Sequence, residues 1–405
     1  MPKIGIESLG FASAKNFIAI EDLAIRRGVD PEKYIQGLGQ KEMAIITPCE
    51  DTVTMAAHAG LRALENADIN PESIDLLIVG TETGIDHSKP AASYVHELLK
   101  LSPQCRVIET KHACYGATAG LQFAIDRALA GRSNGKKSLI IASDIARYGI
   151  GTAGEPTQGA GAAAIIVSDN PRLINIETEA EGLYSKQVMD FWRPLYNKEA
   201  VVDGHFSVQC YLDAIEGSYT NWQQSLTKSG NPLIPSQDIA ACLYHVPFGK
   251  MAKKAHEKYL SLTGINDRDL INKDYNLRVT PYLELCSRVG NVYTGSLYFS
   301  LYNLMVDAGE LLSGKPISMF SYGSGCMAEY FQATIAKNAL KLPDYRPILD
   351  ERTRVDASEY ERLFIANTRA DENNNRLDPK DWGSLDNPFI FQGVENHKRQ
   401  YIRNN

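Results

Sequence analysis

Metal-binding and disulfide patterns are missing from this 405-residue sequence. Its 7 cysteines are scattered, no two of them form a Cys-x-x-Cys pair, and neither a His-Glu-x-x-His segment nor a cluster of His and Asp is present. Because zinc sites are typically built from such patterns, we expect no bound metal. An odd number of cysteines without a secretory leader favours free thiols in a reducing cytoplasm.

Long apolar segments and an excess of positive charge are missing as well. The first residues, "MPKIGIESLGFAS", have no apolar core behind a basic leader, and runs such as "LLIV" and "AAAIIV" are far too short to span a membrane. The formal net charge of −7 argues against a nucleic acid or an anionic membrane as the main partner. We therefore expect a cytoplasmic protein that binds neither.

The sequence does contain short apolar runs that alternate with longer helical patterns, which is typical of an α/β fold with a parallel or mixed sheet. The length suits two domains or one large duplicated fold, and we divide the chain at 1–172 and 173–405. The tail from about residue 366 is polar and turn-rich, so we expect loop with one last strand at 387–392. The patterns predict strands at 74–79, 106–109, 138–142, 162–167, 239–246 and 316–320, and helices at 53–66, 89–100, 115–130, 207–228, 247–262 and 292–312.

One cysteine, Cys114, stands where a predicted strand ends and a helix begins, in "ETKHACYGATAGLQ". A thiol at a helix N-terminus faces unpaired backbone N–H groups and the positive end of the helix dipole, which lower its pKa. The small residues after it let a substrate approach closely. We infer a nucleophile that carries an acyl group as a thioester, with a buried and inert thiol as the alternative.

Two ionisable residues follow other apolar strands, where α/β proteins collect active-site groups. Glu82, in "LLIVGTETGID", is a carboxylate that partial burial can tune to act as a general base or acid. His245, in "LYHVPFGKMAKKAH", can donate a proton or a hydrogen bond to a substrate oxygen. The alternatives are an exposed loop carboxylate and a structural histidine bonded to the backbone.

Lysines and small polar residues mark three further segments. Lys250, Lys253 and Lys254 are spaced to share one helix face, which suits either a phosphate-bearing ligand or a solvated basic stripe.

Asn291, in "SRVGNVYTGSLY", precedes a predicted helix as an N-cap or as an amide that points into a site. Gly323 and Ser324, in "FSYGSG", stand at a strand end, where free backbone N–H groups can form an oxyanion hole. The glycine spacing fits neither a Walker loop nor a dinucleotide fingerprint.

In their order and contexts, Glu82, Cys114, His245, Asn291 and the "SYGSG" loop resemble the hydroxymethylglutaryl-CoA synthase family of the thiolase superfamily. The resemblance extends from about residue 30 to about residue 331, and more weakly to the C-terminus. It rests on "IVGTETGID", "HACYGATAGLQ", "SDIARYG", "GEPTQGAGA", "DFWRP", "VDGHFS", "YHVPFGKMAKKA", "VGNVYTGSLY" and "FSYGSG". Several of these segments are long enough to be specific, so the resemblance favours the nucleophile interpretation of Cys114.

The resemblance implies a thiolase-like, five-layered αβαβα fold of two similar halves, a homodimer, and no metal or redox cofactor. It implies that Cys114 takes an acetyl group from a thioester donor and that Glu82 removes a proton from the acetyl methyl group. The resulting carbon nucleophile attacks the ketone of an acetoacetyl thioester, which His245 and Asn291 hold and polarise. Water then releases the product from the cysteine.

The same resemblance assigns supporting roles. The backbone N–H groups of Cys114 and Ser324 form the oxyanion hole, and Tyr148 of "ARYG" lines the site. The face with Lys250 and Lys254 fits a phosphopantetheine arm.

Two substrate types remain open within the family. "GLGQKEMA", "DFWRP" and "EPTQGAGA" are similar to members that use acetoacetyl-CoA in the mevalonate pathway, whereas "PCEDTVTM" and "GSGCMAEYF" are similar to members that act on acyl carrier proteins in polyketide β-branching. We expect the CoA type, with the carrier-protein type as the alternative. A ketoacyl synthase III-like enzyme is less expected because Glu82 follows the strand, and a non-catalytic binding protein is disfavoured by the complete Cys, Glu and His set.

Overall fold

The first half of the chain supplies five strands of a ten-stranded sheet. The structure, a computed structural model, describes residues 3–231 and 236–404. The five strands are β1 (Gly5–Ser13), β4 (Ile74–Gly80), β5 (Arg106–Thr110), β6 (Lys137–Ala146) and β7 (Gly159–Ser168). They stand in the order β5-β4-β6-β7-β1, with β4 parallel to β5 and β6 and with β7 antiparallel to both of its neighbours.

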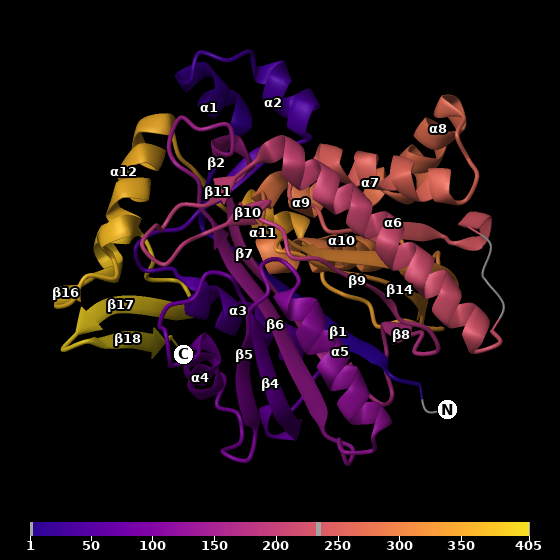
Figure 1. The fold of residues 1–405 in the computed structure, drawn as a ribbon. Helices are drawn as coiled ribbons and strands as arrows, with labels where there is room; N and C mark the ends of the chain where they lie inside the picture. The colour runs from indigo at the N-terminus through magenta and orange to yellow at the C-terminus, as the bar shows by residue number, and fades with distance from the viewer. Residues whose placement is uncertain (1–2, 232–235, 405) are drawn as a thin grey trace.

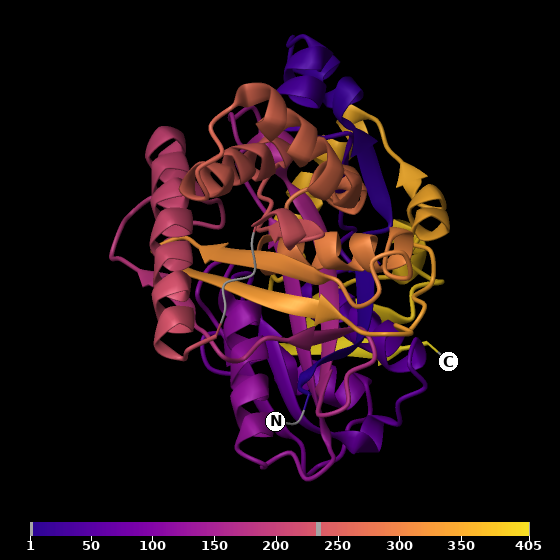
Figure 2. The same ribbon diagram turned by 90° about the vertical axis from the view of Figure 1, so that its right-hand side faces the viewer.

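The second half supplies the other five strands. These are β8 (Ile174–Ile176), β9 (Gly182–Ser185), β12 (Ala241–Tyr244), β13 (Pro316–Gly323) and β14 (Met327–Ile335). The order β12-β13-β14-β8 joins the first half through a short antiparallel pairing of β8 with β1, and β9 pairs with β14. Figure 2 shows β13 and β14, in orange, beside a long helix at the left of that view.

Helices cover both faces of the first-half strands (Figure 1). These helices are α3 (Thr52–Glu65), α4 (Ala91–Leu98) and α5 (Gly116–Leu129). Gly60 of α3 packs against Leu139 and Ile141 of β6, whereas Gly120 of α5 packs against Ile140. Because consecutive side chains of a strand point to opposite faces, α3 and α5 lie on opposite sides of the sheet.

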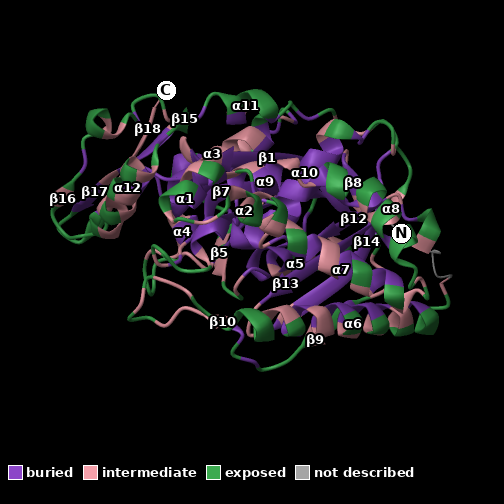
Figure 3. Ribbon diagram, turned by 90° about the horizontal axis from the view of Figure 1, so that it is seen from above, coloured by how far each residue is buried: buried purple, intermediate pink, exposed green. Residues whose placement is uncertain are grey.

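Two helices separate the strands of the two halves. They are α5 and α10 (Ser296–Asp307), and the outer helices of the second half are α6 (Gly204–Lys228) and α7 (Gly249–Leu262). Thr118 of α5 is 2.7 Å from Ser321 of β13 and 2.7 Å from Tyr298 of α10, while Tyr211 of α6 packs on Phe320, the neighbouring residue of β13. The five layers are therefore helix, strand, helix, strand and helix, and the strands form the buried centre in Figure 3.

Shorter elements surround these layers. The helices are α1 (Ile20–Arg26), α2 (Pro31–Leu38), α8 (Arg268–Arg278), α9 (Glu284–Val289), α11 (Arg346–Asp350) and α12 (Ala357–Arg369). The strands are β2 (Asn16–Ala19), β3 (Glu42–Ile45), β10 (Phe191–Trp192), β11 (Val201–Val202), β15 (Thr353–Arg354), β16 (Asn375–Arg376), β17 (Phe389–Glu395) and β18 (Lys398–Arg403). No helix in the described part of the chain is long and apolar enough to cross a membrane.

The α/β architecture predicted from the sequence is confirmed, but two regions differ. The tail is more ordered than expected, since α12 extends to residue 369 and the last strand is followed by a second one that forms a hairpin. The sequence patterns also missed β1 and β14, because buried polar residues such as Ser8, Glu329 and Gln332 interrupt their apolar runs. The helix expected at 292–312 is shorter, because a separate turn at Tyr293–Gly295 precedes α10.

Candidate active site

Cys114 lies on the tight turn between β5 and α5. Ala113 has a positive φ of 41°, and the N–H of Tyr115 donates to the carbonyl of His112 at 3.0 Å. The helix begins at Gly116, and the side chain of Cys114 is buried. The turn therefore presents the thiol beside the end of the sheet.

Glu82 meets this thiol because the end of β4 packs against the start of α5. A Cβ atom at Gly80 would lie 2.4 Å from the backbone nitrogen of Ala117, an approach that requires glycine. Two residues beyond Gly80, the Oε1 atom of Glu82 accepts a hydrogen bond from the Sγ atom of Cys114 at 3.1 Å. The structure thus brings together the two side chains that the sequence analysis assigned as nucleophile and base.

Burial controls the charge of this pair. Burial and the negative charge of Asp144 raise the pKa of Glu82, Arg193 and the Cys114 hydrogen bond lower it, and the net result is a pKa of about 8. Burial and the negative charge of Glu82 also hold the pKa of Cys114 well above its usual range. The expectation of a lowered thiol pKa is therefore wrong, because desolvation outweighs the dipole of a helix that begins two residues later. A carboxylate with a pKa near neutrality is suited to accept a proton from sulfur or carbon.

Asp144 holds the loop that carries the base. This buried residue of β6 accepts hydrogen bonds on Oδ1 from the backbone N–H groups of Glu82 and Thr83, at 2.9 and 3.0 Å. The hydroxyls of Thr81 and Thr83 donate to the same oxygen at 2.9 Å, and Thr294 donates to Oδ2. Asp144 was not predicted from the sequence as a site residue, although an acid at the end of an apolar strand, in "SDIARYG", was a signal.

Aromatic rings enclose the nucleophile. Cys114 packs with Ala146 and Tyr293 in a small apolar cluster, and Phe191 of β10 packs against it. The Phe191 ring lies 5.7 Å from that of Tyr293 and 6.3 Å from that of Tyr148, between ring centroids. Tyr148, which the resemblance placed in the site, is buried beside Phe191, and burial together with the negative charges of Cys114 and Glu82 raises the pKa of its hydroxyl.

Arg193 connects the segment after β10 to the base. Its guanidinium donates a hydrogen bond to the backbone carbonyl of Glu82, and its positive charge lowers the pKa of that carboxyl. Arg193 was not predicted from the sequence as a site residue, although it lies in the segment "DFWRP". A cation next to the buried carboxyl of Glu82 limits the cost of a negative charge in the site.

The turn after β13 lies against the nucleophile turn. A Cβ atom at Gly323 would lie 2.4 Å from the carbonyl oxygen of His112 and 2.7 Å from the nitrogen of Tyr115, so only glycine allows this contact. Ser324, the next residue, is half-buried. The structure thus brings the expected oxyanion loop from the second half to the residues on either side of Cys114.

A second buried acid, Asp190, anchors this loop. Its Oδ1 atom accepts a hydrogen bond from the N–H of Gly325 at 3.0 Å, and its Oδ2 atom accepts one from the hydroxyl of Tyr322 at 2.7 Å. Its negative charge also raises the pKa of Cys114. Sequence reasoning missed this residue, since an isolated Asp in a loop segment gives no signal of burial.

His245 follows β12 and is almost fully buried. Its backbone N–H donates to the carbonyl of Phe320 at 2.8 Å, and its backbone carbonyl accepts from the hydroxyl of Tyr211 at 2.7 Å. Burial lowers the pKa of the imidazole to about 3, so the ring is neutral. The ring nitrogen Nδ1 is 2.7 Å from Ser296 Oγ, which in turn lies 3.2 Å from the carbonyl oxygen of Tyr293 beside the nucleophile.

The structure shows Asn291 in the first of the two roles that the sequence left open, as a cap. Its Oδ1 atom accepts a hydrogen bond from the N–H of Tyr293 at 2.9 Å and so caps the turn before α10. Its own N–H donates to the carbonyl of Thr157 at 3.1 Å, and the residue is buried. Because the amide oxygen is engaged, the Nδ2 group is the part of this side chain that a substrate can use.

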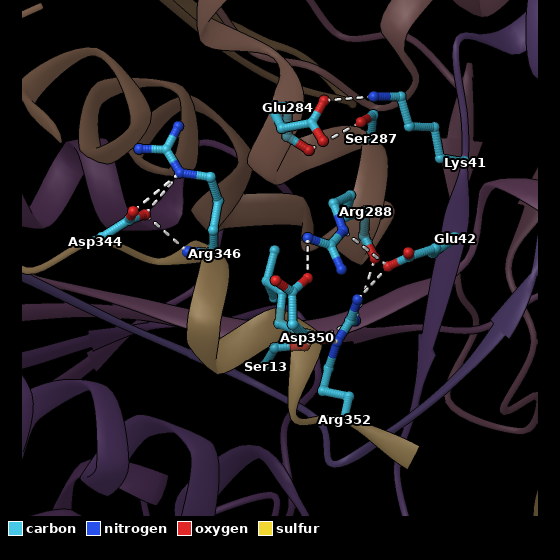
Figure 4. Close-up of polar contacts among 11 residues, drawn as sticks. Ser13, Lys41, Glu42, Glu284, Ser287, Arg288, Asp344, Arg346, Asp350 and Arg352 are labelled. Atoms are coloured by element: carbon cyan, nitrogen blue, oxygen red, sulfur yellow. Dashed lines mark hydrogen bonds and ion pairs between the residues drawn. The ribbon is translucent and has the colours of Figure 1, made fainter. Parts of the chain in front are cut away.

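An ion-pair network holds α9, the helix that leads to Asn291 (Figure 4). The carboxylate of Glu42 in β3 lies between the guanidinium groups of Arg288 and Arg352. Arg288 also pairs with Asp350 at 2.8 Å, and Arg352 donates to the backbone carbonyl of Arg288 at 3.1 Å. Residues from three distant parts of the chain therefore position the loop that starts two residues after Arg288.

The three lysines of α7 that the sequence suggested for phosphate binding differ in their surroundings. Lys253 lies with its Nζ atom 5.9 Å from the ring of Tyr275 in α8, so it points toward that helix. Lys250 is exposed and Lys254 is half-buried. The structure therefore leaves Lys250 accessible to a phosphate but does not link these lysines to the nucleophile. Within residues 3–231 and 236–404, no group of three or more His, Cys, Asp or Glu side chains is placed to hold a metal ion.

Comparisons with known proteins cover nearly the whole chain. The family model for the hydroxymethylglutaryl-coenzyme A synthase N terminal matches residues 1–171, and the C-terminal model matches residues 174–268 and 268–403. The hydroxymethylglutaryl-CoA synthase of Enterococcus faecalis is 38% identical over 365 residues, 89% of this chain and 91% of that protein. The polyketide biosynthesis 3-hydroxy-3-methylglutaryl-ACP synthase PksG of Bacillus subtilis is 35% identical over 381 residues, 90% of this chain and 88% of that protein.

Solved structures are similar to this one over their full length. MvaS in complex with 3-hydroxy-3-methylglutaryl coenzyme A is 41% identical, with a TM-score of 0.89 and coverage of 100% of this chain and 99% of that one. The HMG synthase of the curacin biosynthetic pathway is 31% identical, with a TM-score of 0.91 and coverage of 99% and 100%. The expectation of a thiolase-like, layered fold made of two halves is confirmed.

Proposed function

Because the chain belongs to the hydroxymethylglutaryl-CoA synthase family and is an acyltransferase, we propose that it condenses a Cys114-bound acetyl group with acetoacetyl-CoA and hydrolyses the adduct to hydroxymethylglutaryl-CoA. The observation that carries this proposal is the hydrogen bond of 3.1 Å between the Cys114 thiol and the Glu82 carboxylate. It places a nucleophile and a proton acceptor at one point, as acyl storage followed by carbon–carbon bond formation requires.

The first step is transfer of the acetyl group. The sulfur of Cys114 attacks the acetyl carbonyl of acetyl-CoA, the carbon–sulfur bond to CoA breaks, and the thiol proton moves through Glu82 to the departing CoA. The backbone N–H groups of Cys114 and Ser324 stabilise the developing oxyanion, since Gly323 brings the Ser324 loop against the nucleophile turn.

The second step forms the new carbon–carbon bond. Glu82 removes a proton from the methyl group of the acetyl thioester, and that carbon attacks the ketone of acetoacetyl-CoA. His245 and the Nδ2 group of Asn291 hold the acetoacetyl group, and the alkoxide takes up the proton that Glu82 carries. Water then cleaves the thioester and restores the Cys114 thiol, so acetyl-CoA, acetoacetyl-CoA and water give hydroxymethylglutaryl-CoA and free CoA.

Substrate recognition extends along α7. We assign Lys250 and Lys254 to the phosphates of the CoA or phosphopantetheine arm, and Tyr148 to the wall of the acyl pocket. The reaction as written balances without an oxidant, a reductant or a metal ion, so we propose that the enzyme needs no cofactor. Full activity after dialysis against a chelator is the expected result.

Acyl-carrier-protein substrates are the second candidate. PksG is named as an ACP synthase, and the curacin HMG synthase has been solved in complex with acetyl donor-ACP. In that case the same residues act in polyketide β-branching instead of the mevalonate pathway. A ketoacyl synthase III-like condensation is not supported by these relatives.

Intact-protein mass after mixing with acetyl-CoA, and in parallel with an acetyl-loaded carrier protein, tests the proposal. Rapid addition of one acetyl group from acetyl-CoA, absent in Cys114→Ser, supports the CoA enzyme. Loading from the carrier protein alone supports the second candidate. A folded wild-type protein that accepts acetyl from neither donor refutes both.

We further propose a homodimer in a reducing cytoplasm. Strand β5 ends the sheet order, and within the described residues its outer edge has no partner strand. Ile108 on β5 is 44% exposed and Phe123 on α5 is 56% exposed, so antiparallel pairing of two β5 edges across a twofold axis would cover both. Light scattering should give the mass of two chains, and Ile108→Lys should shift it toward one. The seven free thiols suit a reducing compartment.

A further inference from the structure

A buried neutral histidine can offer a substrate either a hydrogen-bond donor or an acceptor, depending on which ring nitrogen carries the proton. His245 is 3% exposed, and the rings of Tyr211 and Tyr322 lie together on one side of it, with centroids 6.3 and 6.5 Å from the imidazole and 5.1 Å from each other. In a neutral imidazole, one nitrogen carries a proton and the other carries a lone pair. The role proposed for His245, which is to polarise a ketone, needs the proton on the nitrogen that faces the substrate.

The partner of Nδ1 is Ser296, the first residue of α10. Its Oγ atom lies 2.7 Å from His245 Nδ1, 3.2 Å from the backbone nitrogen of Val246 and 3.2 Å from the carbonyl oxygen of Tyr293. Val246 N–H can only donate, so it occupies one lone pair of the hydroxyl. The single hydroxyl proton must then go to either Nδ1 or the Tyr293 carbonyl.

Two observations direct that proton to Nδ1. The Tyr293 carbonyl already accepts the backbone N–H of Ser296, whereas Nδ1 has no other hydrogen-bond partner among the described residues. The hydroxyl oxygen also lies closer to Nδ1, at 2.7 Å, than to the Tyr293 carbonyl oxygen, at 3.2 Å. The hydroxyl therefore donates to Nδ1, and the ring proton resides on Nε2.

We propose that Ser296 is a positioning residue that holds His245 in its Nε2–H form, so that the imidazole donates a hydrogen bond to the acetoacetyl carbonyl. Nε2 makes no hydrogen bond to any residue in the described ranges, which leaves it available to a ligand. This inference rests on the proposed function for its consequence, but the protonation of the ring can be observed without any substrate.

Two substitutions and a control test the inference. Ser296→Ala removes the donor to Nδ1, and Ser296→Thr keeps a hydroxyl at the same position. Ser300→Ala removes a buried hydroxyl one turn later in α10, where it contacts the thiol of Cys286 at 3.6 Å. All three variants lose or alter a buried serine of one helix, so a general packing effect would appear in the control as well.

The first readout is the ¹⁵N spectrum of the histidine side chains, with His245 assigned by its loss in His245→Gln. Wild type and Ser300→Ala should show a protonated Nε2 and a bare Nδ1, while Ser296→Ala should shift toward the other form. A wild-type spectrum with the proton on Nδ1 overturns the proposal, as does an unchanged spectrum in Ser296→Ala.

The second readout separates two reactions of the enzyme. Ser296→Ala should acetylate Cys114 at the wild-type rate but lose about tenfold to a hundredfold in kcat/KM for acetoacetyl-CoA, and Ser296→Thr should recover most of it. Equal loss of both reactions means that Ser296 is structural and overturns the proposal. If the wild type performs no condensation, the proposed function fails, while the spectrum still decides the protonation of His245.

Discussion

Replacing Glu82 with glutamine is predicted to speed the alkylation of Cys114 while strongly slowing the condensation reaction. The change preserves size but removes the charge beside the thiol, whose hydrogen bond to Glu82 is 3.1 Å long and whose pKa that charge raises. A like charge at such a distance typically opposes ionisation by one pH unit or more, so its loss increases the thiolate fraction about tenfold or more. Because the pKa of Glu82 is about 8, this charge is present at pH 9 and largely neutralised at pH 6.

The assay is alkylation of Cys114 by iodoacetamide between pH 6 and pH 9, followed by peptide mass spectrometry. The rate of Glu82→Gln relative to wild type should be near one at pH 6 and about ten or more at pH 9. Condensation should fall by about 10²- to 10⁴-fold because the carbon base is gone. Glu109→Gln, which alters a part-buried carboxylate bonded to the N–H of Ala91, is the matched control. Equal alkylation rates at pH 9 would refute the reasoning.

Three further substitutions have defined outcomes. Gly323→Ala puts a Cβ atom 2.4 Å from the His112 carbonyl, so acetylation should slow about tenfold or more with the circular dichroism unchanged; a normal rate contradicts this contact. Burial raises the pKa of Glu329 to about 8, so the folded protein keeps this proton at pH values where the unfolded chain has lost it. The contribution of Glu329 to the free energy of unfolding therefore falls as the pH rises from about 4.5 to about 8. Glu329→Gln should reduce this fall by about 1 kcal/mol or more in urea titrations at pH 5 and pH 8, and an unchanged fall argues against it. Arg352→Met leaves Glu42 with one of its two guanidinium partners, so urea unfolding should show a loss of about 1–3 kcal/mol, and a negligible loss would show that the pair is dispensable.

The positions of the main chemical groups could be predicted because they follow strand ends. Glu82 follows the apolar strand β4 and Cys114 follows its neighbour β5, and parallel neighbours such as these end at the same edge of the sheet. His245 follows β12, which is parallel to β13, and the same rule places it near the Gly323 turn. In these cases a local pattern determines where a side chain stands.

What depends on the assembled environment could not be predicted. The sign of the pKa shift of Cys114 was wrong because local helix position was considered without burial. The roles of Asp144 and Asp190 were missed, since each holds backbone N–H groups of a segment distant in sequence. Strand β17 lies where a last strand was expected, but its hairpin partner β18 was missed because its sequence, KRQYIR, is mostly polar and is only half-buried or exposed.

The contact between Gly323 and the nucleophile turn has a consequence for how this enzyme can be recombined with its relatives. Chimaeras that join a first half from one protein to a second half from another keep each set of strands intact. They also inherit an interface between the halves, where Thr118 hydrogen-bonds to Ser321 and Tyr115 hydrogen-bonds to Glu329, the latter at 2.8 Å. A crossover between the halves should therefore yield active hybrids only when these pairs are transferred as sets.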